Sequence, residues 1–595
     1  MGNLFASFNA GVSGLTAAQT SLYTAAHNLA NATTEGHSRQ QVMVTDSFYT
    51  TQYGVYSNHM QIGKGADVAM IRQVRNQFLD GQYRLQLGRQ SFYETQYKAV
   101  EEIEEVFGEM EGEEFLDVLG EGLWKAIANL QENPQDIVAR TELVSVASQF
   151  IDRARVLQNH LYQYQKNMNQ DVQNQVKDIN DIVSQIRDYN MLIRKFEATG
   201  ERANDYRDAR NLLLDRLGSY INHRQIEEVD GTISIYAEGG YLLEGNVQYN
   251  LSTAYESETS KLLKPVWEVG GDFFIRDELY YAVEDNSDVG SLKGLLVARG
   301  PHATDYTYMP VKPKEEDFRN EEGVLDERAY FNATERYNEE VKVYNETIQP
   351  SIVMTVQAQF DQLIHGIVTM LNDSFCPNKE MEIELADGTK QTITVLDTEK
   401  AAIGDDRDKT IGTELFVRRT TPRYKEVEVN VPGGTEPVKV YQYIEEDPSD
   451  RYTLYTLEQL EVNPELLRDP SKLPLTANPS ADHAEGFKWD LCEDIMKKWQ
   501  QDFSALDPNS LATYDFDGYY GALVGQFATQ GDIWRGIIQN QESTVFSIEG
   551  ERQKVMGVST DEELSDLIKF QQCYNASSRY ITVVDEMIEH LITRM

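Results

Sequence analysis

Residues 136–196 contain neither proline nor glycine, and this stretch constrains the fold more than any other part of the sequence. Its apolar residues recur at steps of three and four, the spacing that places them on one face of an α-helix. A helix of this length is roughly 90 Å long at a rise of about 1.5 Å per residue. The stretch therefore predicts a rod-like unit and not a compact enzyme domain. The predicted buried row is Phe150, Ala154, Leu157, Leu161, Tyr164, Met168, Val176, Ile179, Val183, Ile186, Asn190 and Ile193.

Both ends of the chain carry narrow apolar rows with the same spacing. A row this narrow is typical of a helix that pairs with another helix. Two interpretations are open: each terminal helix packs on its own domain, or the two helices pair with each other and with neighbouring subunits. The N-terminal row is Phe5, Phe8, Val12, Leu15, Gln19, Leu22, Ala26 and Leu29. The C-terminal row is Leu567, Phe570, Tyr574, Ser577, Ile581, Val584, Ile588, Leu591 and Met595.

The chain between these rows changes from helical to β patterns and back. Periodic apolar residues predict further helices at 74–106, 115–133, 204–217 and 356–370. The turn pairs Asp230-Gly231 and Gly239-Gly240 flank alternating residues and indicate a hairpin. Short β-type runs between Asp387-Gly388 and Gly433-Gly434 predict an inserted β region, and helices return from about residue 485.

The predicted fold class is mainly α with inserted β. Coiled-coil terminal helices pair N- with C-terminal, a long helical rod-like middle domain carries a β-hairpin region, and a mainly-β insertion lies outermost. We expect an inner domain at 1–65 with 548–595 and a middle domain at 66–375 with 460–547, its β-hairpin region at 223–300. The outer insertion is expected at 376–459.

Charge and cysteine content exclude several functions. The sequence has 54 Lys and Arg against 97 Asp and Glu, a formal net charge of -43, which disfavours nucleic acid and anionic membrane surfaces as partners. The three cysteines, Cys376, Cys492 and Cys573, have no spacing typical of zinc or redox sites. A secretory signal peptide and a membrane-inserted segment are not expected, because no sufficiently long apolar run occurs.

A search for catalytic and ligand-binding patterns identifies no site. The nine histidines include no pair at a spacing of three or four, so the helical zinc motif is missing. Phosphate-binding loops, dinucleotide fingerprints and nucleophile elbows are also missing from the sequence. A calcium-loop candidate that opens at Asp285 has too few carboxylates at its ligand positions. We therefore predict no catalytic residue, no metal ligand and no cofactor.

Motifs at both ends resemble those of the bacterial flagellar rod, hook and hook-associated proteins. Near the N-terminus they are FNAGVSGLTAAQ at 8–19, HNLANA at 27–32 and GHSRQ at 36–40. Near the C-terminus they are GVSTDEEL at 557–564, FQQCYNASSR at 570–579 and DEM at 585–587. Inside the chain, DYRDARNLLLD at 205–215 and GSLKGLL at 290–296 are similar to family motifs, although Lys293 stands where the family usually has glycine. Residues 300–350 and the β insertion match no pattern of the family.

The resemblance implies a structural protein of the flagellum that forms the junction between hook and filament. Implied partners are further copies in a ring or helical homo-oligomer, the hook protein, the second junction protein, the export apparatus and a cytoplasmic export chaperone. The implied location is extracellular, reached by type III export without a cleaved signal peptide. The assembly interface would use Phe5, Phe8, Val12, Leu15, Leu22, Leu29, Leu567, Phe570, Tyr574, Ile581, Val584, Ile588 and Leu591.

Two alternatives are open. The chain could be a hook or distal-rod structural protein of the same family. It could also be a flagellar surface protein whose outer domain has hydrolase or adhesive activity.

Overall fold

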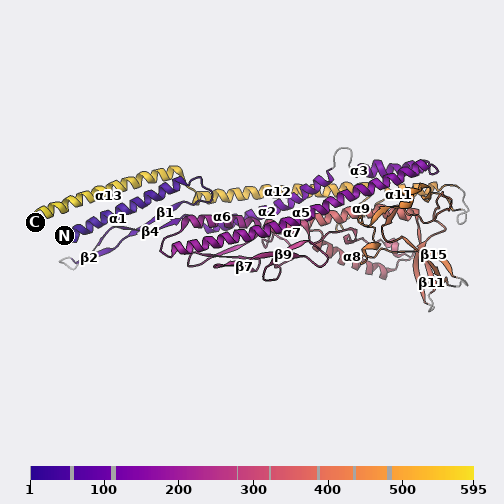
Figure 1. The fold of residues 1–595 in the computed structure, drawn as a ribbon, viewed down its shortest axis with the longest axis horizontal. Helices are drawn as coiled ribbons and strands as arrows, with labels where there is room; N and C mark the ends of the chain where they lie inside the picture. Colours follow the sequence, from indigo (N-terminus) through magenta and orange to yellow (C-terminus); the bar gives the residue numbers. More distant parts are fainter. Residues whose placement is uncertain are drawn as a thin grey trace.

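The computed structural model describes residues 2–53, 59–108, 115–277, 279–319, 323–384, 389–432, 437–478 and 486–594. The molecule is elongated (Figure 1). Helices α1 (Gly2–Ala30) and α13 (Thr560–Arg594) lie at one end, and strands β11 (Asn378–Glu384) and β15 (Val438–Tyr443) project at the other. Both ends of the chain therefore lie at the same tip.

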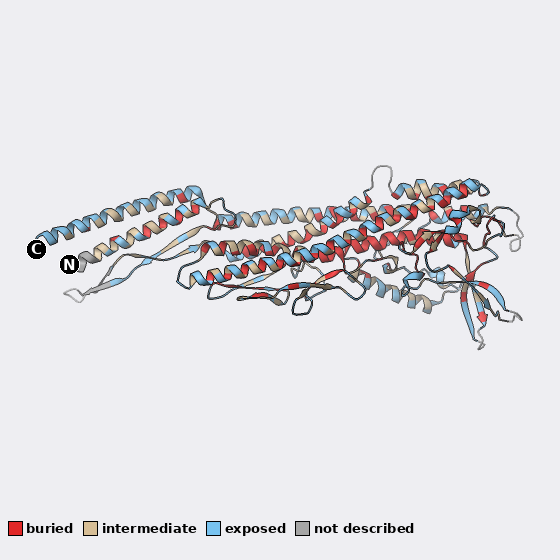
Figure 2. Ribbon diagram, viewed as in Figure 1, coloured by how far each residue is buried: buried red, intermediate tan, exposed pale blue. Residues whose placement is uncertain are grey.

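Long helices form the body between these ends. The helix predicted at residues 136–196 is present as α5 (Ile137–Glu197), with Asp136 as its N-cap accepting the amide of Val138 at 2.9 Å. It packs with α2 (Gln77–Phe107), α9 (Ile352–Phe375) and other elements around one continuous apolar core. Figure 2 shows buried residues concentrated along these helices and mostly exposed residues on α13.

Other helices complete this body, and all but the residues named above follow in chain order. They are α3 (Phe115–Asp117), α4 (Lys125–Glu132), α6 (Asn204–Tyr220), α7 (Ser291–Arg299), α8 (Glu327–Thr347), α10 (Pro464–Arg468), α11 (Trp489–Trp499) and α12 (Phe516–Met556). Short helical turns are η1 (Val118–Trp124), η2 (Tyr306–Tyr308), η3 (Glu315–Phe318), η4 (Arg451–Thr453) and η5 (Pro470–Lys472).

The single helix predicted at 115–133 is wrong in one detail. The chain changes there from α3 to the π-helical turn η1 and then to α4. Gly120 and Gly122 lie in η1 and have low α-helix propensity, while Leu119 and Leu123 of the same turn are fully buried. Burial of these two leucines is the physical reason that we assign to the wider turn. The acidic residues at 109–114 lie outside the described residues.

The strands form small antiparallel sheets. The predicted hairpin is present as β6 (Ile233–Ala237) and β7 (Gly240–Glu244), whose connecting residues Glu238 and Gly239 have φ of 42° and 77°. Their sheet also contains β5 (Arg224–Glu227) and β8 (Val247–Gln248), and β9 (Leu251–Tyr255) pairs with β10 (Leu263–Trp267). A ribbon beside α1 was not predicted. It consists of β1 (Gln40–Asp46), β2 (Tyr49–Tyr53), β3 (His59–Gly63) and β4 (Ala66–Gln73).

A four-stranded sheet projects at the outer end in the order β11, β12, β15, β14, where β12 is Lys390–Leu396 and β14 is Tyr424–Val429. It buries its own small cluster of Ile383, Ile393, Val395 and Val440. Neighbouring residues such as Phe416 and Tyr455 belong to the main core instead. Strand β13 (Phe416–Arg418) pairs with β16 (Leu460–Val462), and β17 (Ser504–Ala505) pairs with β18 (Thr513–Tyr514). The turn pairs at 387–388 and 433–434, and residue 485, lie outside the described residues.

One carboxyl group is buried in the core of α9. Asp361 is 1% exposed and accepts the backbone amides of Leu457 and Tyr306, each at 3.1 Å. Burial raises the pKa of Asp361 to about 7 despite these two hydrogen bonds, and the nearby Asp305 raises it further. The folded chain therefore holds this proton at a pH where the unfolded chain has released it.

This difference predicts how stability changes with pH. Because the folded pKa of Asp361 is above its unfolded value, its contribution to stability is complete below about pH 4 and is lost as pH rises through about 7. The loss amounts to up to about 4 kcal/mol. Asp361→Asn removes the titration, so urea unfolding at pH 5 and pH 8 should show a smaller pH-dependent fall in stability for the variant than for the wild type. Equal falls in both proteins would contradict this assignment.

Candidate assembly surface of the terminal helices

Helices α1 and α13 run side by side in opposite directions (Figure 1). Their backbones approach closely where α1 has glycine. A Cβ atom at Gly11 would lie 2.8 Å from Ile581 Cγ1, and one at Gly14 would lie 3.1 Å from Ser577 Oγ. The two glycines thus permit a separation that larger residues would prevent.

The buried face of α1 consists of small residues. Ala17, Ala18, Ser21 and Ala25 are all at most 8% exposed, whereas the larger apolar residues of the helix lie beside them. The ribbon covers part of the same helix, since Asn28 exchanges two hydrogen bonds with the backbone of Gln40 at 2.9 and 3.0 Å. Our sequence reasoning missed this face because it followed large apolar residues. Small residues at three and four spacing were the available signal.

The residues predicted for the assembly interface occupy different degrees of burial. On α1, Phe8, Leu15, Leu22 and Leu29 are half-buried and Val12 is exposed, while the side chain of Phe5 lies outside the description. On α13, Val584 is buried, Leu591 is exposed, and the remaining five are half-buried. Those five are Leu567, Phe570, Tyr574, Ile581 and Ile588. Their use as an interface between subunits stays a prediction.

A second set of apolar residues on α13 was not predicted. Tyr580, Val583 and Met587 are 46%, 47% and 54% exposed and follow one another at steps of three and four. Val583, Met587 and Leu591 line a shallow depression together with Glu586 and His590. Helix α13 therefore presents more apolar surface than its contact with α1 covers, and a continuous exposed row of this kind is typical of an interaction surface.

The start of α13 is held by Arg39 from the segment after α1. Its guanidinium Nε lies 2.7 Å from Glu563, and its other nitrogens lie 3.3 Å from Glu562 and 3.5 Å from Asp566. The amide of Arg39 also donates to the carbonyl of Met556 at 2.8 Å. The arginine and the acidic residues of two terminal motifs are therefore in direct contact.

A buried cluster of charges lies just inside this joint. Arg552 of α12 contacts Asp80 of α2 at 3.0 Å and Asp215 of α6 at 2.8 Å, and Arg84 of α2 also contacts Asp215 at 2.6 Å. Burial alone would raise the pKa of Asp80, but the hydrogen bond from Arg75 and the nearby Arg552 and Arg84 outweigh it and hold that pKa below its usual value. The charges therefore tie three helices together at the base of the terminal pair.

Two further observations bear on function. No helix among the described ranges has a stretch long and apolar enough to cross a membrane. The sequence search named no metal ligand, yet the fold brings His27, His37 and Asp205 together at the joint. Sequence spacing gave no signal for this group, since its members are 10 and 168 residues apart along the chain.

Two family models match the chain. The model described as the flagellar hook-associated protein FlgK helical domain matches residues 100–329. The model described as the flagellar basal body rod FlgEFG protein C-terminal matches residues 553–594, which contain nearly all of α13.

Similar proteins extend these matches over the whole chain. Flagellar hook-associated protein 1 of Bacillus subtilis is 23% identical, with 98% of this chain and 96% of that protein covered. Its counterpart in Escherichia coli is 22% identical, with 98% of each covered. The structure of the flagellar hook junction protein FlgK from Burkholderia pseudomallei covers 80% of this chain and 100% of that chain at 13% identity and a TM-score of 0.48. From the terminal motifs, the two family models and the near full-length relatives, we conclude that the chain belongs to the family of flagellar hook-associated proteins.

Proposed function

We propose that this chain is a structural subunit of the bacterial flagellum that forms the junction between hook and filament. The observation that carries the proposal is the match, over 98% of the chain, to proteins named flagellar hook-associated protein 1. The elongated shape and the terminal helix pair support a subunit of a larger assembly. The role is mechanical and not catalytic.

The terminal helices are the proposed assembly surface. In an isolated chain, Tyr580, Val583 and Met587 expose apolar area that costs free energy in water. Burying this row against the half-buried residues of α1 in a neighbouring copy would recover that free energy. Coiled-coil packing between copies, in a ring or helix, is the arrangement that we infer from the narrow rows.

The remaining parts follow the same proposal. An inner domain at 1–65 with 548–595 would contact other copies, a middle domain at 66–375 with 460–547 would form the wall, and residues 376–459 would form the outer domain. Partners would be the hook protein, the second junction protein, the export apparatus and an export chaperone. The subunit would act outside the cell after export without a cleaved signal peptide.

The alternative of a hook or distal-rod protein is less well supported, because the matched helical domain at 100–329 is that of hook-associated proteins. For an enzymatic or adhesive outer domain, we find no specific observation in its favour among the described residues.

A charge in the apolar row tests the assembly surface. Val583→Asp should abolish swimming and incorporation into the flagellum, because the carboxylate is solvated in the free chain and would be buried without a partner after assembly. Ile581→Asp should have the same effect, and it should also separate α13 from Gly11 of α1. Swimming of cells that carry each variant, and electron microscopy of their flagella, measure the outcome.

Thr582→Asp is the matched control, because Thr582 is exposed and lies on the opposite face of the same helical turn. Cells with this variant should swim. Circular dichroism should show that all three purified variants keep the folded middle helices. Normal swimming with Val583→Asp would refute the assembly surface.

A further inference from the structure

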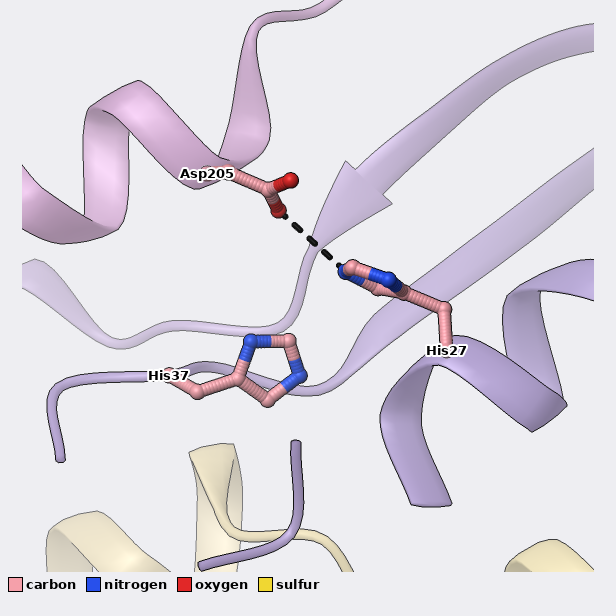
Figure 3. Close-up of side chains that lie close together, drawn as sticks. All are labelled: His27, His37 and Asp205. Carbon is pink, nitrogen blue, oxygen red and sulfur yellow. Dashed lines mark hydrogen bonds and ion pairs between the residues drawn. The ribbon is translucent and has the colours of Figure 1, made fainter. Parts of the chain in front are cut away.

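Two imidazoles and a carboxylate meet where the terminal helices join the body of the molecule. His27 lies in the last turn of α1, His37 in the segment that follows, and Asp205 in the first turn of α6 (Figure 3). Each side chain brings a donor atom within 4.8 Å of the other two. Nε2 of His27 already lies 3.3 Å from Oδ1 of Asp205. Three separate segments therefore contribute to one compact group.

The environment of His37 points to a missing ligand. Its side chain is 7% exposed, and its Nε2 is buried with no hydrogen-bond partner among the described residues. A buried nitrogen without a partner costs free energy, so such atoms are rare unless another species satisfies them. Burial, and then the neighbouring His27, lower the pKa of His37, which keeps the ring neutral as ligation requires.

The other nitrogen of His37 has the surroundings typical of a metal-bound histidine. Its Nδ1 lies 3.7 Å from Oδ2 of Asp208. That carboxylate is itself held in place by the amide of Ser38 at 3.1 Å and by Gln73 at 2.8 Å. Histidines that bind metals commonly direct the second ring nitrogen at a carboxylate, which fixes the orientation of the ring.

We propose that His27, His37 and Asp205 form a site for a divalent transition metal of the zinc class. Two imidazoles and one carboxylate are a donor set that zinc accepts, with water in the fourth position. On a tetrahedral ion, ligands at about 2.0–2.1 Å lie about 3.3 Å from one another. His27 and Asp205 have this separation already, so the remaining adjustment is a movement of His37 by roughly 1.5 Å.

The proposed role of the metal is to fasten the joint. Bound at this place, it would link the end of α1 and the segment around His37 to α6 in the body. Without it, the direct links there include the His27–Asp205 contact and a hydrogen bond from Gln40 to Asp205 at 2.8 Å. Exposed contacts of this kind contribute little. The metal would therefore restrict the angle between the terminal pair and the rod.

Calorimetric titration of the full chain with Zn²⁺ tests the proposal. The protein should carry no polyhistidine tag and should first be treated with a chelator. We expect one Zn²⁺ per chain. His27→Gln and His37→Ala should each weaken binding at least 10-fold, and Asp208→Asn should weaken it about 10- to 100-fold. His160→Ala removes an exposed histidine of α5 far along the chain, and its affinity should be unchanged.

Folding and binding can be separated in this experiment. His27 is 39% exposed at its side chain, so His27→Gln should stay folded even if His37→Ala does not, and circular dichroism checks both. A second readout is hydrogen exchange of residues 27–39, which Zn²⁺ should slow in the wild type and not in His27→Gln. Absence of Zn²⁺ binding, or wild-type affinity in His27→Gln, would overturn the proposal.

Discussion

Arg552→Met should destabilise the protein by about 3–5 kcal/mol. The Arg552 side chain is 4% exposed, donates to Asp80 at 3.0 Å and to Asp215 at 2.8 Å, and stacks over the ring of Tyr83 at 4.1 Å. Methionine keeps most of the packing volume but leaves two carboxylates with less positive charge than they need in a buried place. Urea unfolding followed by circular dichroism at neutral pH measures the loss.

Arg535→Met is the control on the same helix. Arg535 is 51% exposed at its side chain and contacts Asp532 at 3.1 Å and the hydroxyl of Tyr97. Solvent screens such a contact, so the change should cost less than about 1 kcal/mol. If the two variants lost the same stability, the buried charge cluster would not be the tie between helices that its geometry indicates.

Gly88→Val should be the second severe change. A Cβ at Gly88 of α2 would lie 2.5 Å from the carbonyl oxygen of Gly218 and 2.5 Å from Val289 Cγ1. The carbonyl belongs to the backbone of α6 and cannot turn aside, so α2 and α6 must separate. Overpacking typically costs 1–3 kcal/mol and sometimes more, and we expect about 3 kcal/mol or more here because a backbone atom is in the way.

Gly81→Ala provides the opposite result on the same helix. No atom lies within 4 Å of a Cβ at Gly81, and the residue is exposed. Alanine should therefore stabilise the protein by up to about 1 kcal/mol through helix propensity alone. Thermal unfolding of both variants measures the contrast, and a stabilising effect of Gly88→Val would show that the helices do not meet at Gly88.

Local patterns predicted the parts of the fold that depend on neighbouring residues. The apolar period and the lack of helix breakers sufficed for α5, and the turn residues sufficed for the hairpin of β6 and β7. Tertiary packing decided the rest. The π-helical turn η1 depends on burial of Leu119 and Leu123, which periodicity alone does not distinguish from an ordinary helix.

The candidate surface was predictable only in part. The large apolar rows identified the right two helices, but the face where α1 meets α13 uses glycine, alanine and serine, whose small size matters only once a partner is known. Arg552 is 472 residues from Asp80 and 337 from Asp215, so no window of sequence joins them. The same holds for the group around His37, which three separate segments assemble.

The pairing of α1 with α13 fixes the order in which the molecule can be completed. Residues of α1 are among the first to be synthesised, and those of α13 are among the last. At 5–20 residues per second, more than 500 residues take roughly half a minute to two minutes to follow. During that time the closely fitting small face of α1 has no partner, whereas local elements such as α5 can form as soon as they emerge. The terminal pair is therefore the last part of the chain to become ordered, and the stage at which folding is most open to interference.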